Sequence, residues 1–251
     1  MILKVDFKTK KIPRYYNALG ISIIKESIKA SDEEYFKSLY FYNGKNNKAS
    51  KNFSYSVFIK NYTIDKDDFI VNDKVTIYIS TPDYKFGLNL YNGIMNKKTY
   101  KYKEYELIKM RVDLLKEKRI STDKAIFNTL SPICIKNKEG RFLDIDDEEY
   151  IKELNYIADI VLKNYRGYGL KQELSFENIS MKKVVVKEPL REFKKVTNRQ
   201  YQYVNSYKGK FSLSGDIEDL NDIYKLGLGF KRGQAFGNLD VLNEEVMEIE
   251  D

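Results

Sequence analysis

"MILKVDFKTKKIPRYYNALGISIIKESIKAS" (residues 1–31) opens the chain and decides the class of fold. Its first seven residues alternate between apolar and polar side chains, as a half-buried β-strand does. From residue 13 the apolar side chains recur instead at helical spacing. They are Tyr16, Leu19, Ile23, Ile24 and Ile28. The chain is therefore expected to begin with a strand that is followed by a helix.

The rest of the first half continues this pattern. After a short helical piece and the polar loop GKNNKASKN (44–52), the stretches FSYSVFI (53–59) and KVTIYIS (74–80) are typical of antiparallel strands. TPDYKFGLNLYNGIMNK (81–97) then begins with a helix-start signal, and YKYKEYELIKMRVDLL (100–115) is a long strand. The first half therefore reads strand, helix, two strands, helix, strand.

The second half repeats this order. Its elements are the strand AIFNTLSPICIK (125–136), a helix over residues 150–165, the strands MKKVVVKE (181–188) and GKFSLSG (209–215), the helix DIEDLNDIYKLG (216–227) and the strand AFGNLDVL (235–242). The pattern predicts an α+β protein with two tandem ferredoxin-like (RRM-like) βαββαβ domains and antiparallel sheets. The boundary falls near Arg119 to Thr122, so we expect domains at residues 1–120 and 121–251.

The composition excludes several chemistries. The chain has no histidine, so a histidine base, a histidine-ligated metal and the usual nucleophilic triads are unavailable. Cys134 is the only cysteine, which excludes an internal disulfide and a thiolate zinc site. In the context SPICIK it is expected to be a small core residue, with a reactive thiol as the alternative. We therefore predict that the protein uses no metal and no cofactor.

The charge favours an anionic partner. The sequence has 44 Lys+Arg against 37 Asp+Glu, a net charge of +7, and 21 tyrosines interleaved with lysine. This combination suits nucleic acid, because aromatic rings stack on unpaired bases. The alternative is that Lys, Asn, Ile and Tyr reflect an AT-rich genome. The N-terminus carries five charges within residues 4–11, and no run of about 18 apolar residues follows. We therefore expect a cytoplasmic protein without a membrane partner.

A glycine-rich basic stretch, KLGLGFKRGQAFG (225–237), lies late in the chain. It fits neither a dinucleotide fingerprint, because Arg232 stands where the third glycine is needed, nor a Walker loop. Its glycines would let the backbone approach a phosphate, and the adjacent cations Lys231 and Arg232 supply charge, which predicts a clamp on an RNA backbone. The predicted RNA-binding residues are Gly227, Gly229, Lys231, Arg232, Gly233, Gln234, Phe236 and Gly237. The alternative is a helix cap followed by a turn into an edge strand.

This stretch, preceded by YKGKFSLSGDIEDLNDIYKL (207–226), resembles the C-terminal signature of the CRISPR repeat-processing endoribonucleases of the RAMP superfamily. Ala235 replaces the penultimate glycine of that signature. FSYSVFI, FNTLSPICIK (127–136) and YIKELNYIADIVLKNY (150–165) resemble further parts of the family. The resemblance implies tandem ferredoxin-like domains and metal-independent cleavage of precursor CRISPR RNA within its repeats, which yields mature guide RNAs. Attack by a ribose 2′-hydroxyl would leave a 2′,3′-cyclic phosphate and a 5′-hydroxyl. The implied partners are precursor and mature guide RNA, together with other subunits of an effector complex.

The resemblance also implies a catalytic histidine that this chain lacks. The family's usual catalytic histidine lies after the first helix and ahead of the Phe-Ser strand, where this chain has Tyr40. We expect Tyr40 to orient the reactants or transfer a proton and Lys51 to stabilise the phosphate. The alternatives are that Tyr40 is a packed aromatic on a helix face and that Lys51 belongs to a solvated loop. The chain would then be a non-catalytic repeat-RNA-binding subunit. A general two-RRM module is a further alternative, although Gln234 stands where such a module has a stacking aromatic.

A second basic tract covers residues 182–210 and could grip the phosphates of an RNA stem. The predicted contacts are Lys182, Lys183, Arg191, Lys194, Lys195 and Arg199. The alternative is a charged β-hairpin whose alternate residues face water.

Overall fold

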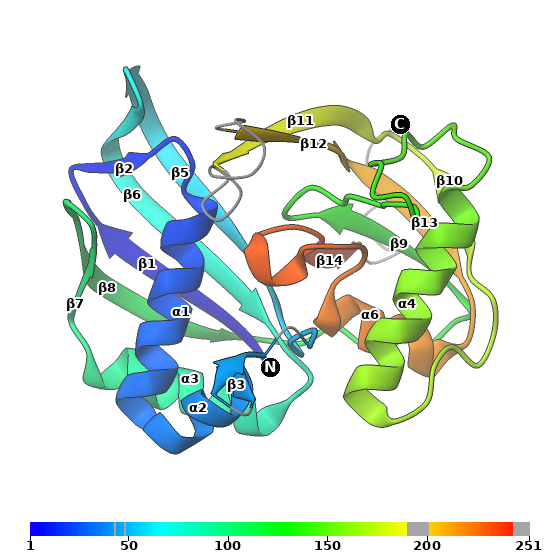
Figure 1. Cartoon of the computed structure of the whole chain (residues 1–251), viewed down its shortest axis with the longest axis horizontal. Coiled ribbons are helices and arrows are strands. Elements are labelled where there is room, and N and C mark those ends of the chain that lie inside the picture. Colours follow the sequence, from blue (N-terminus) through cyan, green and yellow to red (C-terminus); the bar gives the residue numbers. More distant parts are fainter. Residues whose placement is uncertain (43, 48, 190–200, 243–251) are drawn as a thin grey trace. The chain divides into compact units, whose positions relative to one another are not determined.

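A computed structural model of the protein describes residues 1–42, 44–47, 49–189 and 201–242 (Figure 1). The chain divides into two compact units. The first consists of Met1–Glu117 and Arg232–Ala235, and the second of Lys118–Lys231 and Phe236–Asp251. The units reflect packing alone, so the expected boundary at residue 120 stays a prediction for independently folding domains.

The first unit is built on an antiparallel sheet in which β1 and β6 are central, with β8 beside β1 and β5 beside β6. The strands are β1 (Ile2–Lys8), β2 (Lys11–Pro13), β5 (Ser54–Asp65), β6 (Asp68–Ser80), β7 (Thr99–Tyr102) and β8 (Tyr105–Leu115), with the small pair β3 (Phe41–Tyr42) and β4 (Lys45–Asn46) apart from the sheet. The helices are α1 (Asn17–Ser31), α2 (Glu33–Tyr40) and α3 (Tyr84–Asn96). Strand order and helix placement are those of a ferredoxin-like βαββαβ fold.

The core of the first unit lies between this sheet and helices α1 and α3. Four residues of the expected stripe, Leu19, Ile23, Ile24 and Ile28, are buried on α1, whereas Tyr16 precedes the helix and is half-buried. The two helices approach so closely that a Cβ at Gly93 of α3 would lie 1.8 Å from the carbonyl oxygen of Ser27 in α1. A glycine is therefore required at this crossing, where the backbones of α1 and α3 are in contact.

The second unit repeats the topology with a four-stranded sheet in the order β10-β13-β9-β14. Its elements are β9 (Lys124–Thr129), α4 (Tyr150–Arg166), β10 (Ser175–Asn178), β13 (Lys210–Ser214), α6 (Ile217–Leu226) and β14 (Leu239–Leu242). The predicted fold class, tandem ferredoxin-like units with antiparallel sheets, is thus confirmed.

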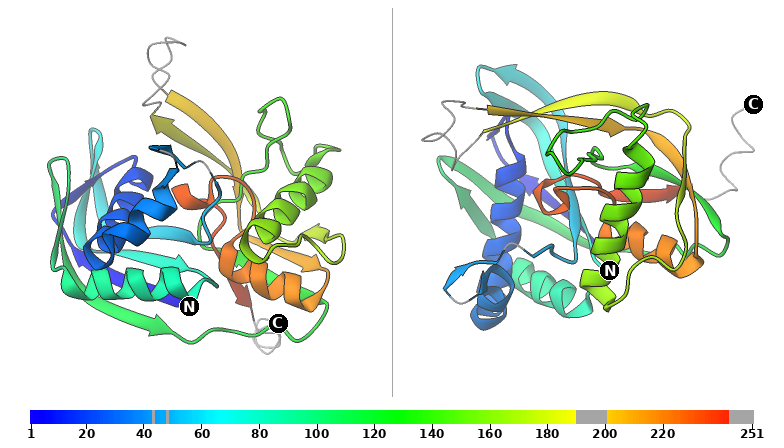
Figure 2. Two further views of the ribbon diagram at one scale, coloured as in Figure 1. Left: turned by 60° about the horizontal axis from the view of Figure 1, so that its bottom comes forward. Right: turned by 45° about the vertical axis from the view of Figure 1, so that its right-hand side comes forward.

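Several strands differ from the expectation. The stretch 100–115 forms two antiparallel strands, β7 and β8, in place of one, and the expected strand 125–136 ends at Thr129 in β9. MKKVVVKE does not join the four-stranded sheet, because Ser175–Asn178 takes that place. It forms β11 (Lys182–Pro189), which among the described residues pairs with β12 (Tyr201–Lys208) alone, in a hairpin drawn in yellow (Figure 2). One face of this hairpin packs on a small core around Cys134, Val204 and Phe236. The last strand is also shorter than expected, because Ala235 and Gly237 have left-handed backbones (φ +60° and +66°) that an extended strand cannot include.

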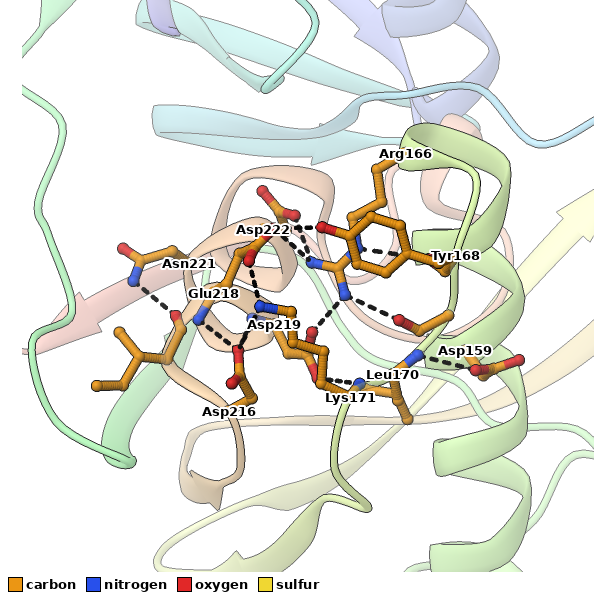
Figure 3. A network of polar contacts seen from close by, with 12 residues as sticks. Asp159, Arg166, Tyr168, Leu170, Lys171, Asp216, Glu218, Asp219, Asn221 and Asp222 are labelled. Atoms are coloured by element: carbon orange, nitrogen blue, oxygen red, sulfur yellow. Dashed lines mark hydrogen bonds and ion pairs between the residues drawn. The ribbon is translucent and has the colours of Figure 1, made fainter.

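A buried ionic network joins the end of α4 to the start of α6 (Figure 3). The Arg166 guanidinium donates to the carboxylates of Asp219 and, at 2.8 Å, Asp222, and to the carbonyl oxygen of Gly169 at 2.8 Å. The backbone N–H of Lys171 donates to the other Asp219 oxygen at 2.7 Å. The Asp219 side chain is fully buried, so its charge depends on these donors. The network fixes the orientation of α6, which leads directly into the glycine-rich stretch.

Candidate functional site

Tyr40 is the last residue of α2 in the first unit. Its ring lies beside that of Phe36, with 5.1 Å between the ring centroids. Its hydroxyl is buried and meets no hydrogen-bond partner within the part of the chain that the structure describes. Burial raises the pKa of Tyr40 above its usual value, so the phenol is neutral at physiological pH. A neutral phenol can donate a hydrogen bond, but it cannot serve as a base.

Two lysines bring their charges to the same ring. The Nζ atom of Lys25, from α1, lies 4.6 Å from the centroid of the Tyr40 ring, and that of Lys51 lies 5.6 Å from it. Both distances allow cation–π attraction. Desolvation lowers the pKa of Lys25, and desolvation followed by the charge of Lys25 lowers the pKa of Lys51. The Tyr40 ring therefore holds together two ammonium groups that repel each other.

Lys51 is held by its own loop. Its Nζ donates to the carbonyl oxygens of Ala49 at 2.7 Å and Asn47 at 3.2 Å. The Asn47 N–H donates in turn to the carbonyl oxygen of Tyr40 at 2.8 Å, which ties the loop to the end of α2. The structure therefore brings together the two predicted catalytic residues, Tyr40 and Lys51.

Sequence reasoning did not find Lys25. The residue follows two buried isoleucines on α1, and nothing in helical spacing shows that α1 passes the end of α2. The only available signal was a lysine directly beside the apolar stripe of the helix.

Arg232 lies in the first unit and is 4% exposed. It opens a short 3-10 helix, η1 (Arg232–Gln234), and its Nη2 donates to the Ser50 hydroxyl at 2.5 Å and the Lys51 carbonyl oxygen at 3.3 Å. Burial lowers the pKa of Arg232 to about 10, so the guanidinium stays charged at neutral pH. The structure directs this charge into the protein, towards the loop of Lys51, whereas the sequence analysis expected it to face a phosphate.

The glycines around η1 serve the packing of the chain on itself. A Cβ at Gly237 would lie 1.9 Å from the carbonyl oxygen of Leu228, and a Cβ at Gly229 would lie 2.8 Å from that of Cys134. Gly227 and Phe236 are also buried, whereas Gly233 is half-buried and Gln234 is exposed. Of the predicted clamp, Gly233 and Gln234 are thus the residues of η1 that reach the surface.

The other predicted cations differ in their surroundings. The Lys231 ammonium donates to Glu188 at 2.7 Å, and Lys183 forms an ion pair with Asp144 at 2.7 Å. Lys182 is exposed on β11. Arg191, Lys194, Lys195 and Arg199 lie outside the described residues. The RNA-binding roles of all these residues stay predictions.

The described residues contain no group of three or more His, Cys, Asp and Glu side chains that could hold a metal ion. None of the helices in the described ranges combines the length and the apolar character needed to cross a membrane.

Comparison with known proteins gives the family. The family model described as "CRISPR associated protein Cas6, C-terminal" matches residues 115–241. A solved structure described as "An RAMP protein binding different RNA substrates" has 19% identity and a TM-score of 0.78, and covers 97% of this chain and 100% of its own. A Cas6-related protein from Pyrococcus furiosus has 20% identity and a TM-score of 0.77, with the same coverage.

A third solved structure, described as a Cas6 product complex, has 12% identity and a TM-score of 0.63, and covers 96% of this chain and 99% of its own. No curated protein matches the chain. At these identities the solved structures establish the fold alone. The family model, by contrast, covers half of the chain, and the chain therefore belongs to the CRISPR associated protein Cas6 family.

Proposed function

We propose that the protein binds CRISPR repeat RNA and cleaves it by attack of a ribose 2′-hydroxyl on the adjacent phosphate. The observation that carries this proposal is the cluster of Lys25 and Lys51 on the ring of Tyr40. Membership of the family supports it, as do similar proteins described as binding RNA substrates and as a product complex. Repeat RNA, as precursor and as mature guide, is the proposed partner, with other effector-complex subunits as further partners.

This reaction needs a proton acceptor, a proton donor and a positive charge near the phosphate, and the cluster can supply all three. The 2′-oxygen forms a bond to phosphorus while the bond to the 5′-oxygen breaks, so one group must take a proton and another must give one. Desolvation lowers the pKa of Lys25, and desolvation together with the charge of Lys25 lowers the pKa of Lys51, so we infer that one lysine reacts as the neutral amine and the other as the ammonium. The neutral amine accepts the 2′-hydroxyl proton, and the remaining ammonium faces the phosphate and supplies the proton for the 5′-oxygen.

The hydrogen bonds divide these roles between the lysines. Two carbonyl oxygens accept from the ammonium of Lys51 and favour its charged form. The contact given for the ammonium of Lys25 is with the Tyr40 ring, and we therefore assign the role of general base to Lys25. Lys51 then stabilises the phosphate, as the sequence analysis expects, and the Tyr40 ring orients both cations.

The experiment is incubation with cognate repeat RNA in EDTA under single-turnover conditions, with both product ends identified. We expect cleavage at one phosphodiester, with a 2′,3′-cyclic phosphate and a 5′-hydroxyl. Lys25→Ala and Lys51→Ala should each slow cleavage by about 100- to 10,000-fold. Lys29→Ala is the matched control, because it removes an exposed lysine from the same helix.

Tyr40 has its own pair of variants. Tyr40→Phe keeps the ring that both cations contact, so it should lose less activity than Tyr40→Leu, which removes the ring. Equal rates for Lys25→Ala, Lys51→Ala and the control would refute the assignment of the site.

The absence of histidine favours a second candidate function, a repeat-RNA-binding subunit that does not cleave. It predicts tight binding of repeat RNA without any cyclic-phosphate product in the same experiment.

A further inference from the structure

The environment of Arg232 differs from that of a nucleic-acid contact. Phosphate binding requires the N–H groups of a guanidinium to face the ligand. Arg232 is 4% exposed, and its Nη2 is directed at the Ser50 hydroxyl and the Lys51 carbonyl oxygen. One guanidinium nitrogen, Nη2, therefore binds two groups of the protein that are neighbours in sequence.

These two groups belong to the loop that carries Lys51. The side chain of Lys51 turns back onto the carbonyl oxygens of Ala49 and Asn47, while its own carbonyl oxygen accepts from Arg232. The residue is thus held at both ends, by its ammonium and by its backbone. Without the guanidinium, Ser50 and Lys51 would lose two hydrogen bonds to a charged donor. The Lys51 ammonium would then no longer be held at a fixed distance from the Tyr40 ring.

Arg232 is itself firmly placed. It opens η1, and the left-handed residues Lys231 and Ala235 (φ +60° at both) lie on either side of that short helix. Ala235 is 5% exposed and belongs to the hydrophobic core of the first unit. The guanidinium therefore extends from a packed segment and can impose its position on the loop.

We propose that Arg232 is a positioning residue, which holds the Ser50–Lys51 backbone so that the Lys51 ammonium meets the scissile phosphate in RNA, and that it makes no contact with the RNA itself. This inference rests on the proposed function for its consequence in cleavage. Its structural content, that Arg232 determines where Lys51 lies, can be tested without RNA.

The test uses Arg232→Lys, Arg232→Gln and Ser50→Ala in the full-length protein. Lysine keeps the charge, but its shorter side chain has no nitrogen at the position of Nη2, which donates to both acceptors, so both Arg232 variants should slow single-turnover cleavage by about 100-fold. The dissociation constant for repeat RNA and its salt dependence should not change. A direct phosphate contact would instead reduce the slope of log affinity against log salt by about 0.7 to 0.9 in Arg232→Gln, which loses the charge, and would leave the slope unchanged in Arg232→Lys; that result would overturn the proposal.

A double-mutant cycle tests the route through the loop. If Arg232 acts through the Ser50 hydroxyl, Ser50→Ala should slow cleavage in the wild-type background and add nothing in the Arg232→Gln background. Independent, multiplying effects of the two substitutions on the cleavage rate would contradict this route.

A final measurement separates this inference from the proposed function. Acylation of Lys51 by an amine-reactive reagent, quantified by mass spectrometry against exposed Lys29, reports the position of Lys51 directly. The rate should rise in Arg232→Lys, whose unchanged circular dichroism spectrum would show that it folds. Equal acylation in wild type and variant would overturn the inference even if the protein cleaves RNA. Faster acylation in a protein that never cleaves would refute the proposed function alone.

Discussion

Replacing Gly237 by alanine tests what the glycine-rich stretch is for. Gly237 has φ +66°, and its N–H donates to the Pro132 carbonyl oxygen at 2.8 Å while its own carbonyl oxygen accepts from Leu228 N–H at 2.9 Å. An added Cβ would lie 1.9 Å from the Leu228 oxygen. The clash involves backbone atoms that two hydrogen bonds hold in place, so a side-chain rotation cannot relieve it.

The cost can be worked out from these numbers. A left-handed backbone costs a non-glycine residue roughly 1–2 kcal/mol, and overpacking adds about 1–3 kcal/mol. The smaller entropy of the unfolded alanine chain returns about 0.4–1 kcal/mol. The net loss of folding free energy is therefore about 1–4.6 kcal/mol. For a chain of this length, at about 3 °C per kcal/mol, the melting temperature should fall by roughly 3–14 °C.

Gly233→Ala is the matched control within the same stretch. Gly233 is not left-handed, and the nearest atom to its added Cβ is Phe53 Cζ at 4.0 Å. Its melting temperature should stay the same or rise slightly. Calorimetry of both variants and of the wild type decides the question. If Gly237→Ala has the melting temperature of the wild type, or if the melting temperature of Gly233→Ala falls by the same amount, the glycines are not required for internal packing.

Three further predictions concern other parts of the molecule. Asp219→Asn leaves the buried Arg166 charge without its main partner and should lower the free energy of unfolding by about 3–5 kcal/mol in urea; a loss below about 1 kcal/mol would contradict the role of the network. Lys25→Gln removes the charge that helps to lower the pKa of Lys51, so that pKa should rise in an NMR titration of the Lys51 side chain, and a fall would contradict the coupling. Gly93→Ala, with its Cβ 1.8 Å from a carbonyl oxygen of α1, should reduce stability by about 1–3 kcal/mol on thermal denaturation, and no change would show that the helices can separate freely.

The fold could be predicted from local pattern, because each element buries one face and its sequence period records that face. The stripe from Leu19 to Ile28 was sufficient to place α1, and the alternation of Val75, Ile77 and Ile79 was sufficient to place the inner part of β6. MKKVVVKE shows the limit of this reasoning. Its pattern predicts a strand correctly, but the choice of its partner strand depends on a small core that includes Phe236, which is distant in sequence.

The candidate site was only partly predictable for the same reason. Tyr40 and Lys51 share a short segment, so a family resemblance could indicate both. Lys25 and Arg232 reach that segment from elsewhere in the chain, and no spacing rule records such a meeting. Arg232 was also misleading, because a cation among glycines suggests an exposed clamp, whereas backbone freedom there serves a buried turn.

The assignment of residues 232–235 to the first unit has a consequence for biosynthesis. A chain leaves the ribosome from its N-terminus, so the sheet and helices formed by residues 1–117 emerge long before the four residues that complete their packing. Until then Ala235 is missing from the hydrophobic core and Arg232 from the Ser50–Lys51 backbone. A nascent chain thus carries both lysines of the proposed site before residues 232–235 can hold Lys51 in place, and the packing around Lys51 is complete only after Ala235 has left the ribosome.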